Sequence, residues 1–269
     1  MPDYKISVGN TEVLSLTDGA DRAPATTLFP NVSLSEWDAY PGLVGEDGKV
    51  DVNFGSFVIR SQGKTILVDT GWGKEYPGLL MDELREKGVS IYEIEIVAIT
   101  HLHVDHVGWN ITEENGASRL TFPNATYYIP REDYDFYNRD LENNAHMNTQ
   151  VNPLESLGAM VLAEGEVTLT SEVTMVPTPG HTPGHMSLGI LSDGQRGYIL
   201  GDVINFAPQA NDTHWEIIFD NDHALARRTR EAVLDRLERD GSVVGMGHYM
   251  PPSFGRFVRR EGRRLWQVV

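Results

Sequence analysis

The fold of this chain is decided by the stretch "THLHVDHVG" (100–108), which follows directly on the apolar run "EIEIVAIT". It places three histidines and one aspartate within six positions, in a chain that has nine histidines among 269 residues. On an extended segment alternate side chains point to the same side, so His101 and His103 can reach one cation. Asp105 and His106 lie beyond a bend and can face a second cation beside the first. Because imidazole and carboxylate ligands suit zinc or a related first-row ion, this spacing predicts a metal site rather than capping histidines in a strand–helix loop.

Three later segments offer further ligands, and each lies at the end of an expected strand. "EVTMVPTPG" (172–180) leads into "TPGHTPGH", where a tight Pro-Gly turn can hold His181 or His185 rigidly. The apolar strand "GYILGD" ends at Asp202, which is either a ligand bridging two ions or an ordinary turn residue. The short strand "SVVGMGH" ends at His248, for which ligation and a structural role both remain open. Strand ends on a rigid sheet are the usual place for a functional site.

The composition excludes several other kinds of chemistry. Cysteine is absent, which leaves out disulfides, thiolate nucleophiles and cysteine-bound metals. The net charge of −17 would repel nucleic acid and anionic membrane surfaces, so we expect neither as a partner. One basic segment, "GRFVRREGRR" (255–264), is expected to be a solvated terminal strand whose arginines pair with the acidic excess. No apolar stretch is long enough to span a membrane, and no signal peptide is visible, so a cytoplasmic location is the default expectation.

The pattern along the chain indicates strands and amphipathic helices without internal repeats. The regular elements expected outside the motifs are a strand at 11–19, a hairpin at 54–71, and helices at 79–88 and 222–241. Residues 20–53 are predicted to form a long irregular loop rich in Pro, Gly and acidic residues. Its aromatic residues Phe29, Trp37 and Tyr40 look exposed within this acidic sequence. A loop of this length usually has a role, so we expect a lid or a subunit contact in a homodimer.

Five elements of the chain, in this order, resemble the metallo-β-lactamase fold hydrolases: "LVDTG" (67–71), "THLHVDHVG" (100–108), "TPGHTPGH" (178–185), "GD" (201–202) and "GMGH" (245–248). The resemblance implies an α+β fold, a four-layer αββα sandwich with a dinuclear site at one edge of the paired sheets. It extends through most of the chain, so residues 1–269 are expected to form one domain. The stretches "VLSLTDG", "GDVINFAPQ" and "GHYMPPSFG" also look like the methyl parathion hydrolase branch, which contains organophosphate and ester hydrolases.

Carried over to this sequence, the family pattern assigns ligands to two divalent ions. The seven residues are His101, His103 and His181 for one ion, Asp105, His106 and His248 for the other, and Asp202 as the bridge. Asp69 in "LVDTG" would orient the site by hydrogen bonds rather than bind a metal. Zn²⁺ is the expected ion, although such ligands also accept Mn, Fe, Co or Ni.

Two residues depart from the family pattern. Trp109 follows "HVDHVG" where a second glycine is frequent. Asn205 stands three residues after Asp202, where quorum-quenching lactonases of this fold carry a functional tyrosine. The missing tyrosine counts against an N-acyl homoserine lactone as substrate.

The expected reaction is hydrolysis, because two divalent ions lower the pKa of a shared water to roughly 7 and thereby supply a bridging hydroxide. Asp105 or Asp202 would carry the proton to the leaving group. No Lys or Arg cluster adjoins the motifs, so a small neutral ester or lactone is expected, with a phosphotriester as the nearest alternative and a β-lactam further away. Trp109, Phe206 and Trp215 either line an apolar substrate pocket or pack beneath loops. A non-catalytic metal-binding protein on the same scaffold is the competing class of function.

Overall fold

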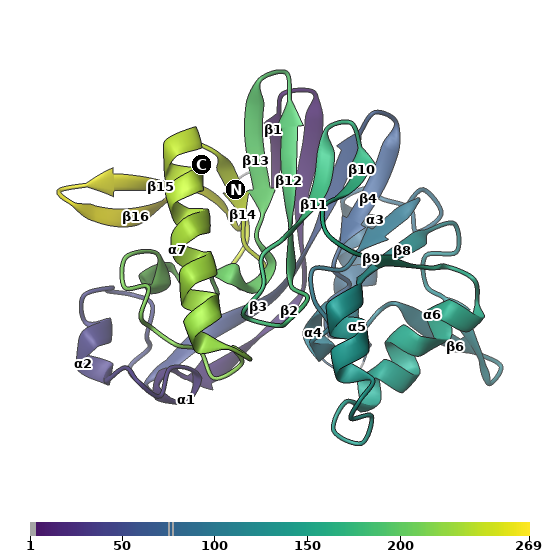
Figure 1. Cartoon of the computed structure of the whole chain (residues 1–269), viewed down its shortest axis with the longest axis horizontal. Helices are drawn as coiled ribbons and strands as arrows, with labels where there is room; N and C mark the ends of the chain where they lie inside the picture. Colours follow the sequence, from purple (N-terminus) through teal and green to yellow (C-terminus); the bar gives the residue numbers. More distant parts are fainter. Residues whose placement is uncertain (1–3, 75, 77) are drawn as a thin grey trace.

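Two seven-stranded sheets form the centre of the molecule (Figure 1). The computed structural model describes residues 4–74, 76 and 78–269. The first sheet contains, in spatial order, β1 (Lys5–Val8), β2 (Thr11–Pro24), β3 (Lys49–Ser61), β4 (Lys64–Val68), β5 (Ile96–Ala98), β8 (Thr126–Pro130) and β9 (Met160–Ala163). The second contains β10 (Val167–Thr170), β11 (Val173–Pro177), β12 (Met186–Ser192), β13 (Gln195–Ile199), β14 (Val243–Gly245), β15 (Phe254–Arg260) and β16 (Arg263–Val268). A separate small sheet pairs β6 (Ile111–Glu114) with β7 (Ala117–Leu120).

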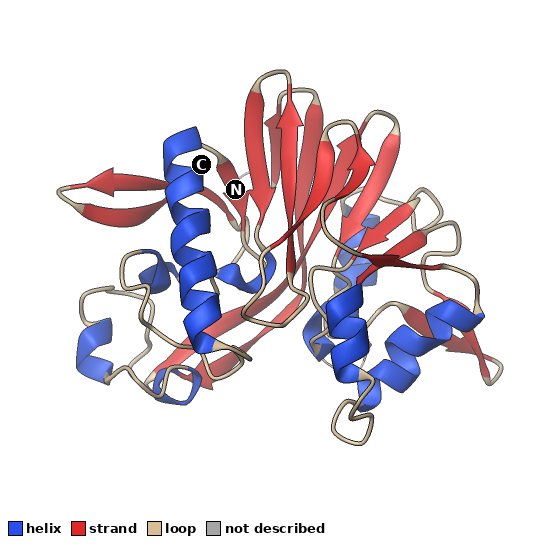
Figure 2. Cartoon of the chain, in the orientation of Figure 1, coloured by secondary structure: helices blue, strands red, loops and turns tan. Residues whose placement is uncertain are grey.

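Helices flank the paired sheets on both outer sides (Figure 2). Beside the first sheet lie α3 (Leu80–Glu86), α4 (Val104–Val107), α5 (Arg131–Tyr137), a π-helical turn (Met147–Val151) and α6 (Asn152–Ser156). Beside the second sheet lie α7 (His223–Asp240) and two 3₁₀ turns (Gly201–Val203 and Ala207–Ala210). The connection from β2 to β3 contains α1 (Ala25–Leu28) and α2 (Leu34–Trp37). Among the described residues, none of the helices combines the length and apolar composition needed to cross a bilayer.

Three apolar cores separate these four layers of secondary structure. Representative members are Ile59 and Leu188 between the two sheets, Val58 and Leu84 between the first sheet and its helices, and Leu234 and Val244 between α7 and the second sheet. Consecutive residues of β3 thus alternate between two cores, because successive side chains of a strand point to opposite faces. A sheet buried on both faces therefore needs apolar residues at neighbouring positions. The expected αββα sandwich is confirmed.

Helix α7 begins and ends where the sequence pattern places it. The Asp222 side chain accepts a hydrogen bond of 2.9 Å from the backbone N–H of Leu225, which caps the first turn. Gly241 follows the last turn with φ of +62°, a left-handed conformation that favours glycine. The hairpin at 54–71 and the helix at 79–88 are confirmed as β3–β4 and α3.

The basic segment at 255–264 forms the β15–β16 hairpin, which projects from the body of the molecule (Figure 1). Two of its arginines pair with the surface of α7: Arg259 lies 2.7 Å from Glu238, and Arg264 lies 2.9 Å from the same carboxylate. The expectation that these arginines pair with acidic residues is confirmed.

The prediction of an irregular loop over 20–53 is wrong at both ends. Strand β2 continues to Pro24 and β3 begins at Lys49, with Asp21 opposite Val52 in an antiparallel pair. The strand passes through "TDG" because the pairing register shifts between Thr17 and Ala20. Such a bulge lets a ladder continue through residues that otherwise indicate a turn.

Two of the three aromatic residues of this connection are buried and Tyr40 is half-buried, so none of them is exposed. Phe29 and Trp37 are only 0% and 2% exposed, and they pack with Phe206 and Trp215 in a satellite core. The ring centroids of Trp37 and Trp215 lie 4.7 Å apart, and Tyr40 lies 5.6 Å from Trp215. The expectation of exposed aromatics is therefore wrong, and Phe206 and Trp215 pack beneath the connection. A lid or subunit contact by the segment 20–53 stays a prediction.

Candidate metal centre

The structure brings the seven candidate ligands together at the carboxyl ends of strands from both sheets. His101 and His103 follow β5, Asp105 and His106 belong to α4, His181 follows β11, Asp202 lies in the 3₁₀ turn after β13, and His248 follows β14. Strands β4 and β5 run parallel, as do β13 and β14, so their carboxyl ends open to one edge of each sheet. The strand ends thus position side chains that are far apart in the sequence.

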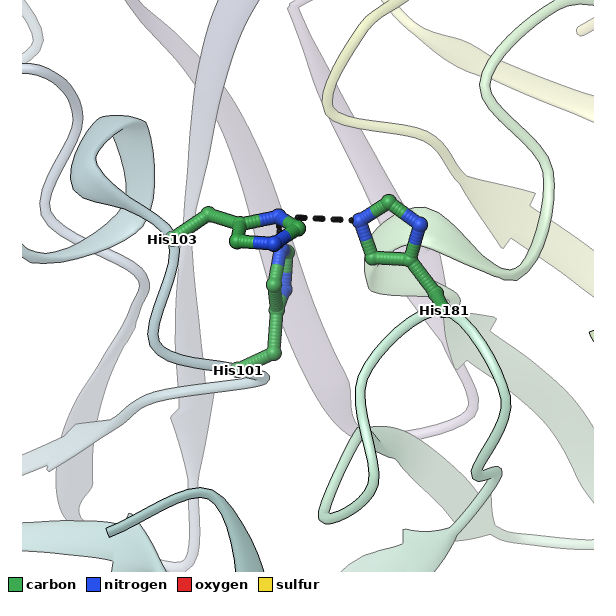
Figure 3. Close-up of side chains that lie close together, drawn as sticks. All are labelled: His101, His103 and His181. Atoms are coloured by element: carbon green, nitrogen blue, oxygen red, sulfur yellow. Dashed lines mark hydrogen bonds between the residues drawn. The ribbon is translucent and has the colours of Figure 1, made fainter. Parts of the chain in front are cut away.

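His101, His103 and His181 form the first group (Figure 3). Their rings point toward a common centre, and one nitrogen of each lies within 4.8 Å of the others. His103 Nδ1 is 3.0 Å from His101 Nε2 and 3.1 Å from His181 Nε2. Three imidazole nitrogens converging in this way make a donor set that suits a first-row metal ion.

Asp105, His106 and His248 form the second group, again with one ligand atom of each within 4.8 Å of the others. Asp105 Oδ2 lies 3.6 Å from His106 Nε2 and 3.8 Å from His248 Nε2. The Asp105 side chain is 15% exposed, whereas that of His106 is 3% exposed. The second group therefore reaches solvent on the side of Asp105.

Asp202 lies between the two groups. Its Oδ2 is 3.2 Å from His181 Nε2, a member of the first group, and 2.9 Å from His248 Nε2, a member of the second. Its Oδ1 is 3.6 Å from His106 Nε2. One buried carboxylate thus faces ligands of both groups, which is the position required of a bridging ligand.

Buried polar atoms without partners indicate that the donor set fits metal ions. His106 Nε2 and Asp202 Oδ1 are both buried and make no hydrogen bond to the described residues. Leaving a buried polar atom unpaired costs about 1–3 kcal/mol, so such atoms need a partner. Both atoms face the space shared by the groups, where divalent ions would satisfy them.

The electrostatics of the site also call for a cation. Burial would raise the pKa of Asp202, but the surrounding histidines, His248 first, hold this pKa well below its usual range. Burial would lower the pKa of His106, but the neighbouring carboxylates, Asp105 first, outweigh it and raise the pKa to about 10. Burial together with the His106 charge lowers the pKa of His101 well below its usual range. A buried carboxylate that stays ionised requires nearby positive charge, from a proton or from a metal ion.

The outward nitrogens of the ligand histidines are held by hydrogen bonds. His106 Nδ1 donates to Asp69 Oδ2 at 2.9 Å, and His248 Nδ1 donates to the carbonyl of Asn53 at 2.8 Å. Asp69 follows β4 and also accepts from the backbone N–H of Thr100 at 2.7 Å. The structure therefore places Asp69 behind the ligands, where it orients an imidazole.

Two further aspartates were missed by the sequence interpretation. Asp220 accepts a 2.8 Å hydrogen bond from His181 Nδ1 and is buried. Asp133 of α5 is buried and accepts hydrogen bonds from the loops that carry His103 and His181. Neither lies in a motif: Asp220 stands among exposed loop residues and Asp133 in a largely half-exposed helix, so neither has a local signal.

His185 has a structural place rather than a place among the ligands. Its Nδ1 donates to the Thr178 hydroxyl at 2.9 Å, and its Nε2 accepts the backbone N–H of Asp202 at 2.9 Å. Burial and the neighbouring His181 lower the pKa of His185 to about 3. A neutral ring is what this accepting role requires. Of the two alternatives left by "TPGHTPGH", His181 faces the candidate ligands and His185 supports the turn of Asp202.

The two residues that depart from the family pattern also make defined contacts. The Trp109 indole N–H donates to Asp18 Oδ1 at 3.0 Å, and its ring packs against the core of the first sheet. Trp109 is therefore half-buried against this core and tied to strand β2. Asn205 Nδ2 donates to Asp202 Oδ2 at 2.8 Å, so this amide touches the candidate bridge directly.

Comparisons with known proteins identify the family and the fold of the chain. Residues 56–248 match the family model described as the metallo-beta-lactamase superfamily. A probable metallo-hydrolase of Bacillus subtilis (strain 168), YflN, is 23% identical over 155 residues, which cover 52% of this chain but only 55% of that protein. An N-acyl homoserine lactonase of a Bacillus species is 23% identical over 224 residues, which cover 74% of this chain and 82% of the lactonase. The solved structure of AidC, a dizinc quorum-quenching lactonase with its product N-hexnoyl-L-homoserine, aligns with a TM-score of 0.83 at 24% identity and covers 98% of this chain and 96% of AidC.

Proposed function

We propose that the chain, which belongs to the metallo-β-lactamase superfamily of metallo-hydrolases, cleaves small neutral esters or lactones with two divalent ions, most simply Zn²⁺. The observation that carries the proposal is the pair of three-residue ligand groups with Asp202 between them. A structural zinc site is one separate group of four ligands, whereas here two groups of three share Asp202, so two ions would lie side by side. Two neighbouring divalent ions are typical of hydrolytic metal sites.

Two bound ions would activate a water as nucleophile and polarise the scissile carbonyl or phosphoryl oxygen. The chain itself supplies orientation and proton transfer. Asp202 is enclosed, is held by Asn205 and faces both groups, so it fixes their separation. Asp105 is partly exposed and lies at the opening of the site, so it is the better placed carboxylate to pass a proton from its Oδ atoms to a leaving group.

The surroundings of the opening favour a neutral substrate with an apolar part. Phe219 is 52% exposed, and its ring centroid lies 6.4 Å from that of His103. An exposed phenyl ring beside a candidate ligand offers apolar contact to whatever enters. The Asp105 carboxylate and the net charge of −17 oppose anionic substrates such as phosphomonoesters.

Lactones and phosphotriesters remain the two neutral classes closest to simple esters. The lactonases among the similar proteins support lactones as the first class to test. Asn205, in place of the tyrosine of quorum-quenching lactonases, counts against a homoserine lactone as the preferred member. Phosphotriesters share the neutrality and the need for a polarised oxygen, and β-lactams are expected to be poor substrates.

The test is a substrate screen on metal-loaded protein, with lactones, activated aryl esters, phosphotriesters and a chromogenic β-lactam side by side. Elemental analysis is expected to find about two ions per chain. His103→Ala and Asp105→Ala are expected to lose at least 100-fold in kcat/KM, because each removes a ligand. His223→Ala, at the exposed start of α7, is the matched control and should keep full activity. Unchanged turnover in both ligand variants would refute the enzymatic role.

A further inference from the structure

We infer that Arg230 of α7 is a positioning residue of the metal centre, which holds both His181 and Asp202 in place through a single buried guanidinium. The inference rests on the metal binding proposed above but not on any particular substrate. Arg230 lies in none of the sequence motifs and is only 1% exposed. It occupies the core-facing side of α7, where its buried neighbours are Ala226, Leu234 and Leu237.

The first connection leads from Arg230 to His181 through Asp220. Arg230 Nη2 donates to Asp220 Oδ2 at 3.1 Å, and Asp220 Oδ1 accepts the Nδ1–H of His181 at 2.8 Å. His181 Nε2, on the opposite side of the ring, faces His103 and Asp202. The carboxylate therefore sets the plane of the imidazole, and the guanidinium sets the position of the carboxylate.

The second connection leads from the same side chain to the turn that carries Asp202. Arg230 Nε donates to the carbonyl of Val203 at 2.9 Å, and Val203 is the next residue after Asp202 in the 3₁₀ turn. Arg230 Nη1 donates to the carbonyls of Thr213 at 3.0 Å and Trp215 at 3.3 Å. All three guanidinium nitrogens thus donate hydrogen bonds. Two of them, Nε and Nη2, bond to residues that support the candidate ligands Asp202 and His181.

Core packing alone does not account for an arginine at this position. A buried ion pair is commonly no more stable than apolar residues of similar volume, so stability gives no reason for this choice. The fixed fork of a guanidinium, in contrast, can bond a carboxylate and several carbonyls in one geometry. The carboxylate behind His106, Asp69, is held by neutral donors instead: it accepts hydrogen bonds from the backbone N–H and the hydroxyl of Thr100. Of these two carboxylates behind ligand histidines, only Asp220, behind His181, is therefore held by a charged side chain.

Loss of Arg230 should weaken one ion more than the other. The ion held by His101, His103 and His181 depends on His181, and residues that orient a ligand imidazole are typically worth roughly 10- to 100-fold in metal affinity. The ion held by Asp105, His106 and His248 shares only the Asp202 turn with Arg230 and should lose less. Because Arg230 does not face the opening of the site, kcat should fall while KM for any substrate stays near the wild-type value.

The experiment measures metal affinity without any substrate, by competition with a chromophoric chelator, on wild type and on Arg230→Met, Arg230→Lys and Asp220→Asn. Absorption spectra of the Co²⁺-loaded proteins report the coordination geometry. The matched control is Arg227→Met, which removes an exposed arginine of the same helix that pairs with Glu231 at 3.0 Å. Thermal unfolding of the metal-free proteins separates lost stability from lost affinity.

In Arg230→Met and Asp220→Asn, we expect one ion to bind roughly 10- to 100-fold more weakly, with a changed Co²⁺ spectrum. Arg230→Lys should recover part of the affinity, because an ammonium can pair with Asp220 but cannot also bond the Val203 carbonyl in the same geometry. Arg227→Met should match wild type. If Arg230→Met does not fold, the metal affinities of Arg230→Lys and Asp220→Asn test the positioning role of Arg230. Wild-type affinities for both ions in these folded variants would overturn the inference alone, whereas a wild type that binds no metal would overturn the proposed function as well.

Discussion

Asp133 joins the two loops that carry most of the candidate ligands, and its ionisation provides a quantitative test of the structure. This fully buried residue of α5 accepts hydrogen bonds from the Leu102 N–H at 3.1 Å, the Thr182 hydroxyl at 2.7 Å and the Gly184 N–H at 2.6 Å. Burial nevertheless outweighs these donors and raises the pKa of Asp133 from 3.8 to about 6. Asp133 is thus an acid that is easier to ionise in the unfolded chain than in the native protein.

This difference in pKa makes the free energy of unfolding depend on pH. Because the folded pKa is the higher one, the contribution of Asp133 to the free energy of unfolding is full below pH 3.8 and is lost as the pH rises through about 6. The rise of the pKa from 3.8 to about 6 corresponds to about 3 kcal/mol, of which about 1 kcal/mol is lost between pH 5 and pH 7. Asp133→Asn removes this pH dependence and adds a pH-independent cost of about 1–3 kcal/mol, since an amide N–H would face one of the donors.

The assay is urea unfolding of metal-free wild type and Asp133→Asn at pH 5, 6 and 7. Wild type should be the more stable protein at pH 5, and its advantage should shrink by about 1 kcal/mol by pH 7. Asp135→Asn, at an exposed position of the same helix, should show a difference from wild type that does not change over this range. A constant difference between wild type and Asp133→Asn would show that the three donors, rather than burial, control this carboxyl, and the reasoning would be wrong.

Three further predictions concern residues whose roles the structure separates. Asp202→Asn should bind fewer ions per chain by elemental analysis, because an amide cannot bridge two cations as a carboxylate does; unchanged metal content would contradict the bridge. Trp109→Phe should lose about 1 kcal/mol of stability through the missing bond to Asp18, with metal content and kcat/KM unchanged. A large change in substrate preference would instead indicate that Trp109 lines the substrate pocket. Trp37→Ala should cost about 3–5 kcal/mol in urea unfolding, and a cost below 1 kcal/mol would contradict its burial in the satellite core.

The sequence predicted best what depends on spacing along one segment. His101, His103, Asp105 and His106 lie within six consecutive positions, and their ligand types are unusual enough together to indicate a metal site without any tertiary information. The more distant His181 was paired with them only through the family resemblance, because residues alone could not choose between it and His185. The four-layer fold likewise came from the order of five motifs rather than from the strand patterns.

The sequence predicted worst what depends on contacts between distant segments. Phe29 and Trp37 looked exposed because their neighbours in sequence are acidic, yet their neighbours in space are Phe206 and Trp215. Arg230 belongs to no motif of the sequence, and only the folded chain places it against Asp220. Such residues have no local pattern, since their partners are set by how the layers pack.

The division of the ligands between the two sheets has a consequence for how the molecule holds together. The first sheet is built from residues up to Ala163 and the second from Val167 onward, and each ligand group draws on both parts. An ion in either group would therefore cross-link the two halves of a chain that has no cysteine for a disulfide. Cleavage of the exposed connection at 164–166 would leave two fragments whose cohesion rises with the concentration of free metal. The supply of metal would then govern how long the protein survives proteases, in addition to whether it can react.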